Sequence, residues 1–326
     1  MLMSRTPFRI SLGGGGTDLP SYCGKHGGFI FGVAIDMYID IFVRRPWVGV
    51  SEKIELQYLQ FESVDFVGDL KHDIGREALR LTGIDSSINI YFHADTPMGT
   101  GLGSSGSCAV SLLGGLWKYL GRPKSQVELA EGAFEITQRL NLPDGKQDPY
   151  LGALGGFTVL EIDEDQSVSW HHPRIGSNTV HDFLSHSFFF YTGARRESVE
   201  VLRDQDSNKA LDLKHRTKAI GRQVLSAFER GNLDDFGHLM HEHWQVKREL
   251  SDKISSPEFD RIYSGALDNG AIGGKLIGAG GGGYFLFYCP NEEAGVTLKK
   301  VMASFGFKPI TLGIDHKGTR VSEIDI

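Results

Sequence analysis

Apolar and polar positions in the first third of the chain alternate with the two-residue period of β-strands. The alternation is clearest at 38–42 and at 87–93, which reads Ser-Ile-Asn-Ile-Tyr-Phe-His. β-Branched and aromatic residues, which favour strands, also fill 9–12, 29–43 and 54–61. We therefore predict four strands over 9–12, 29–43, 54–61 and 87–93.

Helical spacing of apolar residues replaces this alternation at 105–120. Ser125 and Glu128 then have the spacing of a capping box, which predicts the start of another helix. A shorter helix is expected over 75–82, because Gly83 follows it. The first half of the chain is thus expected to mix strands with helices.

The remainder of the chain has the same mixed character, interrupted by a polar stretch at 163–178. We predict strands at 155–162, 185–191, 275–277, 284–288 and 308–313. We predict two helices within 210–250 and further helices at 259–269 and 292–305. We place a domain boundary in the polar stretch and predict two domains, 1–178 and 179–326, each a two-layer α+β arrangement.

Composition and charge narrow the classes of function. Glycine accounts for 42 of 326 residues, well above the usual level of roughly 7%, and it gathers in clusters. The net charge of −7, without a stripe of Lys and Arg, argues against a nucleic-acid partner. The longest apolar run, 29–43, contains Asp36 and Asp40 and is too short to span a bilayer. We expect a cytoplasmic protein with no membrane partner.

A glycine-rich segment at 97–107 carries the strongest chemical signal. A predicted strand enters it and a predicted helix leaves it, so the unpaired amides at the helix start can face an anion. Glycines remove side chains that would block a phosphate, and serine hydroxyls can contact phosphate oxygens or magnesium. The residues expected to bind nucleotide phosphates are Pro97, Gly99, Gly101, Leu102, Gly103, Ser104, Ser105, Gly106 and Ser107.

Two other nucleotide-binding motifs fit this segment less well. Gly101, Gly103 and Gly106 spell GxGxxG, but a Rossmann site needs a second strand and an acidic residue about 20 residues further on. A capped helix is predicted there instead. A Walker loop needs a Lys after its glycines, and none follows here. A nucleotide-binding oxidoreductase is therefore disfavoured.

Two further glycine clusters lie nearer the ends of the chain. Residues 13–18 read Gly-Gly-Gly-Gly-Thr-Asp, and residues 278–283 connect two predicted strands. Each of these two clusters alone is compatible with a simple tight turn. Together with 97–107, in this order and at these separations, they resemble the motifs of the GHMP kinase superfamily. The GGGGTD form, with Gly-Lys-Gln-Asp at 145–148, is similar to the branch of heptose 7-phosphate kinases and fucokinases.

The resemblance implies a fold, cofactors and a reaction. The fold is an N-terminal domain like the second domain of ribosomal protein S5 and a C-terminal ferredoxin-like domain, with the active site between them. ATP and Mg²⁺ are the implied cofactors. The implied reaction phosphorylates the anomeric C1 hydroxyl of D-glycero-D-manno-heptose 7-phosphate. Its 1,7-bisphosphate product feeds nucleotide-activated heptose synthesis for surface lipopolysaccharide or capsule polysaccharide.

The resemblance also assigns roles to single residues. Asp148 matches the catalytic base, which takes the proton of the acceptor hydroxyl. Arg9 matches a cation beside the transferred phosphate, although Phe8 stands where the superfamily has Gly. The implied magnesium ligands are Ser105 and Glu135, with Glu131 and Glu128 as alternative carboxylates.

The acceptor sugar is expected beside the first and third glycine clusters. Asp18 matches the residue that binds sugar hydroxyls in galactokinase. A phosphorylated heptose also needs a cationic pocket away from ATP, for which Arg and Lys are suited. The residues expected to bind this substrate are Gly15, Gly16, Thr17, Asp18, Lys25, Arg196, Gly281 and Gly282.

Two rival functions stay open at this point. One is a kinase of a non-phosphorylated sugar such as fucose or galactose, and the other is an inactive relative that only binds a sugar. The presence of Arg9, Asp18 and Asp148 together disfavours the second, since a binder needs no aligned base. His241 and His243 do not share a helix face, so we expect no zinc site and place His243 in the core or the cleft. Homo-oligomerisation is left open.

Overall fold

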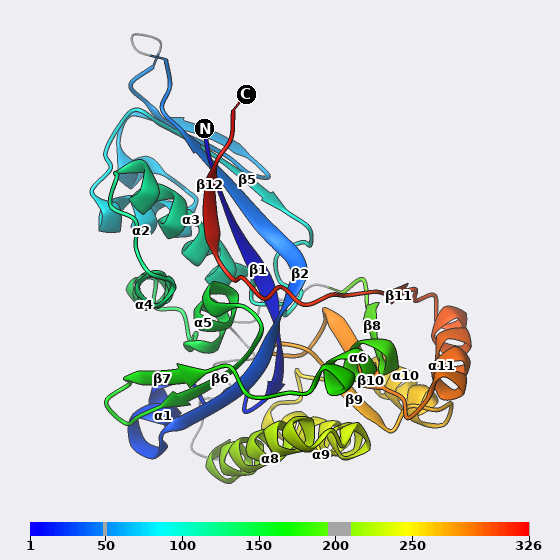
Figure 1. Cartoon of the computed structure of the whole chain (residues 1–326). Helices are drawn as coiled ribbons and strands as arrows, with labels where there is room; N and C mark the ends of the chain where they lie inside the picture. Colours follow the sequence, from blue (N-terminus) through cyan, green and yellow to red (C-terminus); the bar gives the residue numbers. More distant parts are fainter. Residues whose placement is uncertain (48–50, 195–209, 326) are drawn as a thin grey trace.

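A pair of long antiparallel strands forms the spine of the molecule. The computed structural model describes residues 1–47, 51–194 and 210–325. Within them, β1 (Leu2–Gly13) pairs with β2 (Gly28–Arg44) along most of its length (Figure 1). β1 begins at Leu2, before the start predicted at residue 9. The prediction missed its first half because the buried residues there include the polar Ser4 and Thr6, which break the apolar pattern of a strand.

The first sheet contains eight strands of the described residues. Its order is β12-β1-β2-β5-β3-β4, and β2 also pairs with β6, which pairs with β7. Its pairs are antiparallel, except that β3 and β5 run parallel. The remaining strands of this sheet are β3 (Ile54–Gln57), β4 (Phe61–Val64), β5 (Ile88–Ala94), β6 (Phe157–Ile162), β7 (Val168–His171) and β12 (Arg320–Glu323).

The single strand predicted over 54–61 is wrong, because these residues form β3, a turn and the first residue of β4. The amide of Tyr58 donates to the carbonyl of Gln60 at 2.9 Å, which closes the turn. Leu59 is 92% exposed at its tip. β-Propensity cannot detect such a turn, since apolar residues continue through it.

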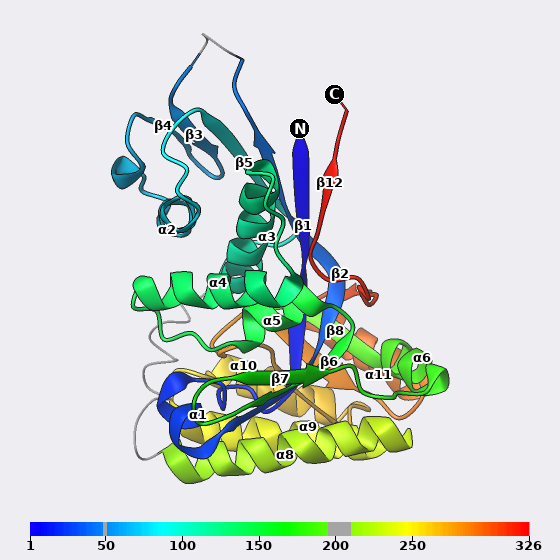
Figure 2. The same ribbon diagram turned by 60° about the vertical axis from the view of Figure 1, so that its left-hand side comes forward.

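Helices cover one face of this sheet, with α3 lying directly on β1 and β2 (Figure 2). Glycines allow the close approach: a Cβ at Gly114 would lie 3.0 Å from Ser4 Oγ, and one at Gly115 would lie 3.0 Å from Val43 Cγ2. The helices of this layer are α2 (Asp73–Thr82), α3 (Ser104–Tyr119), α4 (Gln126–Arg139) and α5 (Gln147–Leu154), and η1 (Val67–Asp69) precedes α2.

The predicted helix signals are confirmed. Gly83 adopts the left-handed conformation after α2, and Ser125 and Glu128 form the capping box of α4. The sequence pattern missed α1 (Pro20–His26), α5, β7 and α6 (Ser177–His186). These elements are short, and α5 carries Pro149 in its first turn, where a missing N–H costs no helical hydrogen bond.

The second sheet is antiparallel, with the order β11-β8-β10-β9. Its aromatic strands bury Phe190, Phe285 and Phe287 against Trp244 in a core of their own. Its strands are β8 (Ser187–Tyr191), β9 (Gly273–Leu276), β10 (Tyr284–Tyr288) and β11 (Pro309–Ile310), accompanied by α8 (Leu211–Arg230), α9 (Leu233–Leu250), α10 (Pro257–Leu267) and α11 (Glu292–Ser304). The molecule therefore has the predicted α+β character.

Contacts at both ends of the spine join the two halves. Gly221 of α8 lies directly on the first glycine cluster, since a Cβ at Gly13 would lie 2.6 Å from the Cα of Gly221. At the other end of the spine, β12 returns from the second half and pairs with β1 (Figure 1). The boundary between 1–178 and 179–326 stays a prediction, with β12 belonging to the sheet of the first half.

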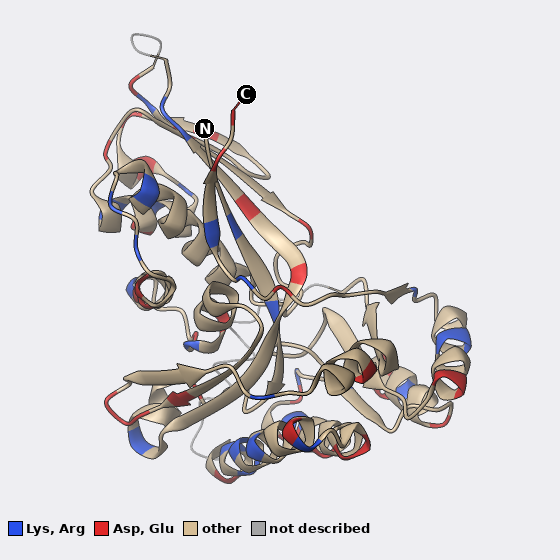
Figure 3. Ribbon diagram, viewed as in Figure 1, with Lys and Arg blue, Asp and Glu red and all other residues tan. Residues whose placement is uncertain are grey.

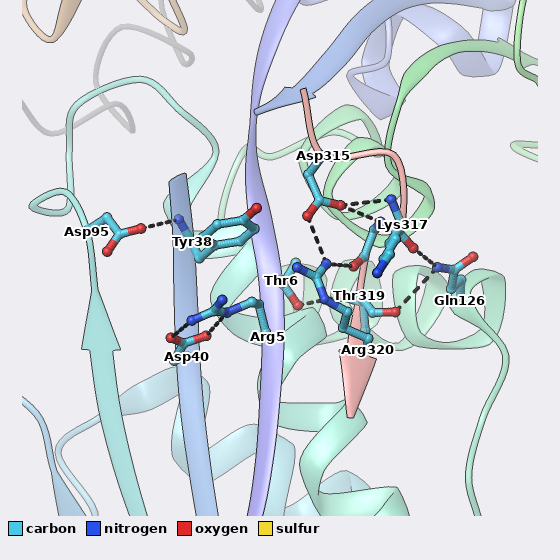
Figure 4. Close-up of polar contacts among 11 residues, drawn as sticks. Arg5, Thr6, Tyr38, Asp40, Asp95, Gln126, Asp315, Lys317, Thr319 and Arg320 are labelled. Atoms are coloured by element: carbon cyan, nitrogen blue, oxygen red, sulfur yellow. Dashed lines mark hydrogen bonds and ion pairs between the residues drawn. The ribbon is translucent and has the colours of Figure 1, made fainter. Parts of the chain in front are cut away.

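The segment that leads into β12 is held by a buried carboxylate (Figure 4). Asp315 accepts hydrogen bonds from the amides of Lys317 at 2.9 Å and Gly318 at 2.8 Å, and Arg320 donates to it at 2.8 Å. The side chain of Asp315 is 4% exposed. Gln126 of α4 donates to the carbonyl of Lys317, so the same turn is fixed to the helical layer.

We expect Asp315→Ala to lower the free energy of unfolding by about 2–3 kcal/mol, because it leaves buried donors unpaired. Burial alone would raise the pKa of Asp315, but the Gly318 and Lys317 amides and Arg320 bring it below its ordinary value of 3.8. The charged form is thus favoured by folding, so its contribution is present above pH 4 and is lost as the pH falls further.

Urea unfolding of Asp315→Ala and the wild type at pH 7 and at pH 3 measures both effects. Asp325→Ala, at an exposed position near the same terminus, serves as the control and is expected to change little. A difference between Asp315→Ala and the wild type that does not shrink at pH 3 would show that the carboxylate charge is not what holds this turn.

Charged residues of both signs are spread over the helices and the ends of the strands (Figure 3). The ion pairs among the described residues include Arg222 with Glu161 at 2.7 Å and Lys124 with Glu128 at 2.8 Å. Among the described helices, none combines the length and the apolar character needed to cross a membrane.

Candidate active site

A cavity of about 490 Å³ lies where the three glycine clusters meet. Its wall includes Gly15 and Gly16 of the first cluster, the start of α3, and Gly278, Gly280 and Gly282 of the third cluster. Residues far apart in the sequence are thus brought together around one space, as the resemblance implied.

The second and third glycine clusters pack directly on one another. A Cβ at Gly278 would lie 2.4 Å from the Cα of Gly101, and a Cβ at Gly283 would lie 2.1 Å from the carbonyl oxygen of Thr100. Gly101 and Gly278 also have positive φ angles, of 80° and 75°. Only glycine fits such positions without strain. The third cluster therefore packs against the backbone of the second and fixes its position.

The second cluster presents backbone and hydroxyl groups at the start of α3. Gly103 is left-handed and directly precedes the helix. The predicted residues that line the cavity are Gly99, Gly101, Gly103, Ser104 and Ser105. This arrangement suits a phosphate group, since unpaired amides and the helix dipole both favour negative charge.

The other predicted members of this cluster lie behind the wall. Ser107 Oγ donates to the carbonyl of Pro7 at 3.0 Å and is buried, and the carbonyl of Leu102 accepts from the amide of Arg9 at 3.1 Å. The carbonyl of Pro97 accepts from Thr100. Gly106 allows α5 to approach, since a Cβ there would lie 2.7 Å from the Cβ of Asp148.

Arg9 and Asp148 meet at the edge of the second glycine cluster. Arg9 Nε donates to Asp148 Oδ1 at 2.8 Å and Nη2 donates to the same oxygen at 2.5 Å, while Nη1 donates to the carbonyl of Gly101 at 2.6 Å. Arg9 is 3% exposed, and both residues line the cavity. The predicted base and the predicted cation are thus held together in the cavity wall, next to the start of α3.

Asp18 does not line the cavity. It is 1% exposed and accepts hydrogen bonds from the amide of Gln147 at 2.8 Å, from Gln147 Nε2 at 3.2 Å and from the amide of Gly16 at 3.2 Å. Burial raises the pKa of Asp18 to about 6, although the Gln147 amide opposes the shift. The side chain orients Gln147, which does line the cavity. Thr17 is also buried and donates to Phe29.

Asp144 is a carboxylate of the cavity wall that the sequence analysis did not select. Burial, together with the charges of Asp148 and Asp18, raises the pKa of Asp144 to about 7. Gly145 follows it and permits the close approach of Asp18, whose Oδ2 would lie 2.1 Å from a Cβ at that position. Three carboxylates therefore gather at the start of α5, and a cation near Asp144 would relieve their repulsion.

Glu135, the predicted magnesium ligand, is not brought to the cavity. Its side chain is 51% exposed on α4 and pairs with Arg139 at 2.6 Å. The alternatives are also occupied elsewhere: Glu131 pairs with Lys146 at 2.6 Å, and Glu128 closes the capping box of α4. The cavity instead offers Ser105 and Asp144 as oxygen ligands for Mg²⁺. The carboxylates of Asp18, Asp144 and Asp148 do not converge on one point: among the described residues, no three His, Cys, Asp or Glu side chains are arranged to hold a metal ion by themselves.

Of the two predicted phosphate-binding cations, the structure describes only Lys25. Lys25 is exposed on α1 and does not line the cavity, and Arg196 lies outside the described residues. Gly281 packs away from the cavity and donates its amide to Ile254 at 2.8 Å, whereas Gly282 lines it.

Other polar residues of the wall escaped the sequence analysis. They are Ser11, Gln147, Thr217, Lys247 and Lys275. The side chains of Ser11, Gln147 and Thr217 have buried oxygens with no hydrogen-bond partner among the described residues. Lys247 could have been found, because it continues the buried stripe of α9 through Met240, His243 and Trp244. His243 is 3% exposed and lines the cavity, which agrees with its prediction, and His241 points elsewhere, to Tyr263.

Comparison with known proteins agrees with this geometry. The family description "GHMP kinases N terminal domain" matches residues 69–156, and "GHMP kinases C terminal" matches 224–307. The chain is 29% identical over 320 residues to a D-glycero-alpha-D-manno-heptose 7-phosphate kinase of Campylobacter jejuni, covering 94% of each protein.

Solved structures show the same fold. A D-glycero-D-manno-heptose 1-phosphate kinase of Bacteroides thetaiotaomicron superposes with a TM-score of 0.81 at 22% identity and 100% coverage of both chains. A putative sugar kinase of Campylobacter jejuni gives a TM-score of 0.79 at 26% identity and covers 99% of this chain and 98% of its own. The predicted two-domain α+β fold is therefore confirmed.

Proposed function

Since this chain belongs to the GHMP kinases and is an ATP-dependent sugar kinase, we propose that its acceptor is D-glycero-D-manno-heptose 7-phosphate. The phosphoryl group goes to the anomeric C1 hydroxyl, and the product is the 1,7-bisphosphate. The identity of 29% along 94% of the Campylobacter heptose 7-phosphate kinase supports this choice of acceptor.

The contact between Arg9 and Asp148 is the observation that carries the proposal. Both hydrogen bonds from Arg9 go to Oδ1 of Asp148, and Oδ2 has no hydrogen-bond partner among the described residues. Oδ2 is therefore the oxygen that takes the proton of the C1 hydroxyl. As it does so, the hydroxyl oxygen forms a bond to the γ-phosphorus of ATP, and the bond from that phosphorus to ADP breaks.

The negative charge that spreads over the transferred group is stabilised by donors that are already in place. These are the amides at the start of α3, the hydroxyls of Ser104 and Ser105, and the guanidinium of Arg9. Because the helix start and the contacts of Arg9 are already formed in the free protein, these donors need little reorganisation during transfer. An anomeric hydroxyl is more acidic than other sugar hydroxyls, so a carboxylate is a sufficient base.

Ser105 and Asp144 are the residues that would hold Mg²⁺, which would neutralise part of the negative charge of the ATP phosphates. They fit this role because Asp144 is a wall carboxylate under repulsion from Asp148 and Asp18, and a cation would relieve that repulsion. Glu135 is not needed for this assignment.

Phosphorus NMR with Mg-ATP and parallel acceptors tests the function. We offer the heptose 7-phosphate, mannose, fucose and galactose to the purified protein. A new anomeric phosphate signal with the heptose phosphate alone is the expected result. Turnover of fucose or galactose in its place would overturn the acceptor and keep the kinase, and absence of turnover with every sugar would overturn the catalytic proposal.

We place the reaction in the cytoplasm, where ATP is available, and its product at the entry to nucleotide-activated heptose synthesis for surface lipopolysaccharide or capsule polysaccharide. A 1-phosphate is the group that a nucleotidyltransferase joins to a nucleotide.

A further inference from the structure

Two lysines of the cavity wall are buried. Lys247 of α9 is 8% exposed, Lys275 of β9 is 3% exposed, and both line the cavity close to the third glycine cluster. Burial of a lysine is unfavourable unless an opposite charge accompanies it. The positions of these two residues therefore call for an explanation that the transfer step does not provide.

Their hydrogen-bond partners carry no negative charge. Lys247 donates to the carbonyls of Leu276, at 2.9 Å, and Gly278. Lys275 donates to the carbonyl of Leu12 at 3.2 Å and lies 3.2 Å from His243 Nδ1. Within 1–47, 51–194 and 210–325, no carboxylate forms an ion pair with either lysine. A bound anion would supply the missing charge.

The surroundings oppose the charged state of both lysines. Burial, with the charge of Arg9, lowers the pKa of Lys247 to about 7. Burial, with the charges of Lys247 and Arg9, brings the pKa of Lys275 well below its ordinary value. An anion beside them would reverse these shifts, so binding it would draw protons onto the lysines.

His243 adds a neutral hydrogen-bonding ring to this group. Burial, with the charges of Lys275 and Lys247, lowers its pKa well below the ordinary value, so the ring is neutral at pH 7. Its Nδ1 lies 3.2 Å from Lys275 Nζ. The ring also lines the cavity, so it can hydrogen-bond a ligand there without adding a charge.

Lys275 is attached to the first glycine cluster. Its bond to Leu12 joins it to the residue before that cluster, whereas the start of α3 forms another part of the wall. Leu12 is also next to Ser11 in β1. An anion at Lys275 would thus lie on the side of the cavity where the resemblance places the acceptor sugar.

Unpartnered oxygens accompany the cations. Ser11 Oγ, Gln147 Oε1 and Thr217 Oγ1 are buried without a hydrogen-bond partner among the described residues, and all three side chains line the cavity. A Cβ at Gly15 would lie 3.0 Å from Ser11 Oγ and 3.6 Å from Gln147 Oε1, so this glycine leaves space beside both oxygens. Buried polar groups of this kind are normally satisfied, here by hydroxyls of a ligand.

We propose that Lys247 and Lys275, with His243, bind the phosphate that the acceptor sugar already carries, while Ser11, Gln147 and Thr217 hydrogen-bond its hydroxyls. The inference rests on the proposed phosphorylated acceptor and assigns that phosphate to residues other than Lys25. It makes the cavity selective for a sugar phosphate over the free sugar, because a free sugar leaves the two buried lysines without an opposite charge.

Steady-state kinetics of Lys275→Met and Lys247→Met test the assignment. Loss of one charged contact should raise KM for the heptose 7-phosphate about 10- to 100-fold, with KM for ATP changed less than about twofold. Lys300→Met, at an exposed position of α11, is the matched control and should keep both constants. Lys25→Met, the rival, should also keep them.

Thermal unfolding without ATP separates a binding role from a structural one. The heptose phosphate should raise the Tm of the wild type and raise that of Lys275→Met much less, while Lys275→Met alone should be at least as stable as the wild type. If the wild type turns over the heptose phosphate and both lysine variants keep its KM, the subsite is wrong and the function stands. An equal rise in KM for ATP, or an effect at Lys25 alone, would also overturn the subsite. Turnover of a free sugar only would overturn the function itself.

Discussion

Asp148→Asn is expected to lower kcat by about 10²- to 10⁴-fold, the usual contribution of a general base. The amide of Asn has the same shape as the carboxylate and keeps an Oδ1 that can accept from Arg9, but it cannot take the proton of the acceptor hydroxyl. ATP binding should change little, because the phosphate loop is formed by other residues, at 99–105. Single-turnover rates and nucleotide titration measure the two effects separately.

Asp165→Asn is the matched control for this substitution. Asp165 is an exposed carboxylate of the turn before β7 and lies outside the cavity wall. Its replacement should leave both the rate and the affinity for ATP unchanged. Turnover of Asp148→Asn within about threefold of the wild type would show that another group, or solvent, accepts the proton.

Glycine clusters were the part of the site that could be predicted from the sequence. Their requirement is local, because a backbone that approaches a phosphate or another backbone closely admits no Cβ. Gly101 and Gly103 illustrate it: the first packs on Ile277 and the second on Arg9. The family motifs assigned Arg9 and Asp148 separate roles at the transferred group, and the ion pair between them is a finding of the structure.

Lys247, Lys275 and Thr217 could not be assigned in the same way. Each belongs to an element of the second half, and its place in the wall depends on how that half packs on the first. Tertiary packing of this kind leaves no local pattern, apart from the buried stripe of α9 that includes Lys247. Isolated cations in a chain with 34 Lys and Arg residues are otherwise indistinguishable from surface charge.

Glu135 and Asp18 show the limits of matching motifs by spacing. The interval from Glu135 to Asp148 fits, but α4 continues to Arg139 and turns the Glu135 side chain toward solvent. Asp18 is close to the site, yet its carboxylate is occupied by the amides of Gln147 and Gly16. Spacing locates a backbone position along the chain, whereas the role depends on which face of the element meets the cavity.

Arg9→Lys is expected to lower kcat by about 10³-fold, in the range found for cations that stabilise transferred phosphoryl groups. Arg9 contacts Asp148 with Nε and Nη2 and the carbonyl of Gly101 with Nη1. Lysine keeps the charge but has a single nitrogen, so it cannot hold the base and the phosphate loop together. Arg5→Lys is the control, because Arg5 lies on the same strand and makes a similar pair with Asp40 outside the cavity.

The double variant Arg9→Lys, Asp148→Asn tests whether these residues act as one unit. If Arg9 works partly by holding Asp148, the second substitution should cost little once the first is made, and the double variant should be about as slow as the slower single variant. Single-turnover rates at saturating ATP and acceptor provide the comparison. Effects that multiply fully would mean that Arg9 stabilises the phosphoryl group independently and that its contact with Asp148 in the free enzyme has no part in catalysis.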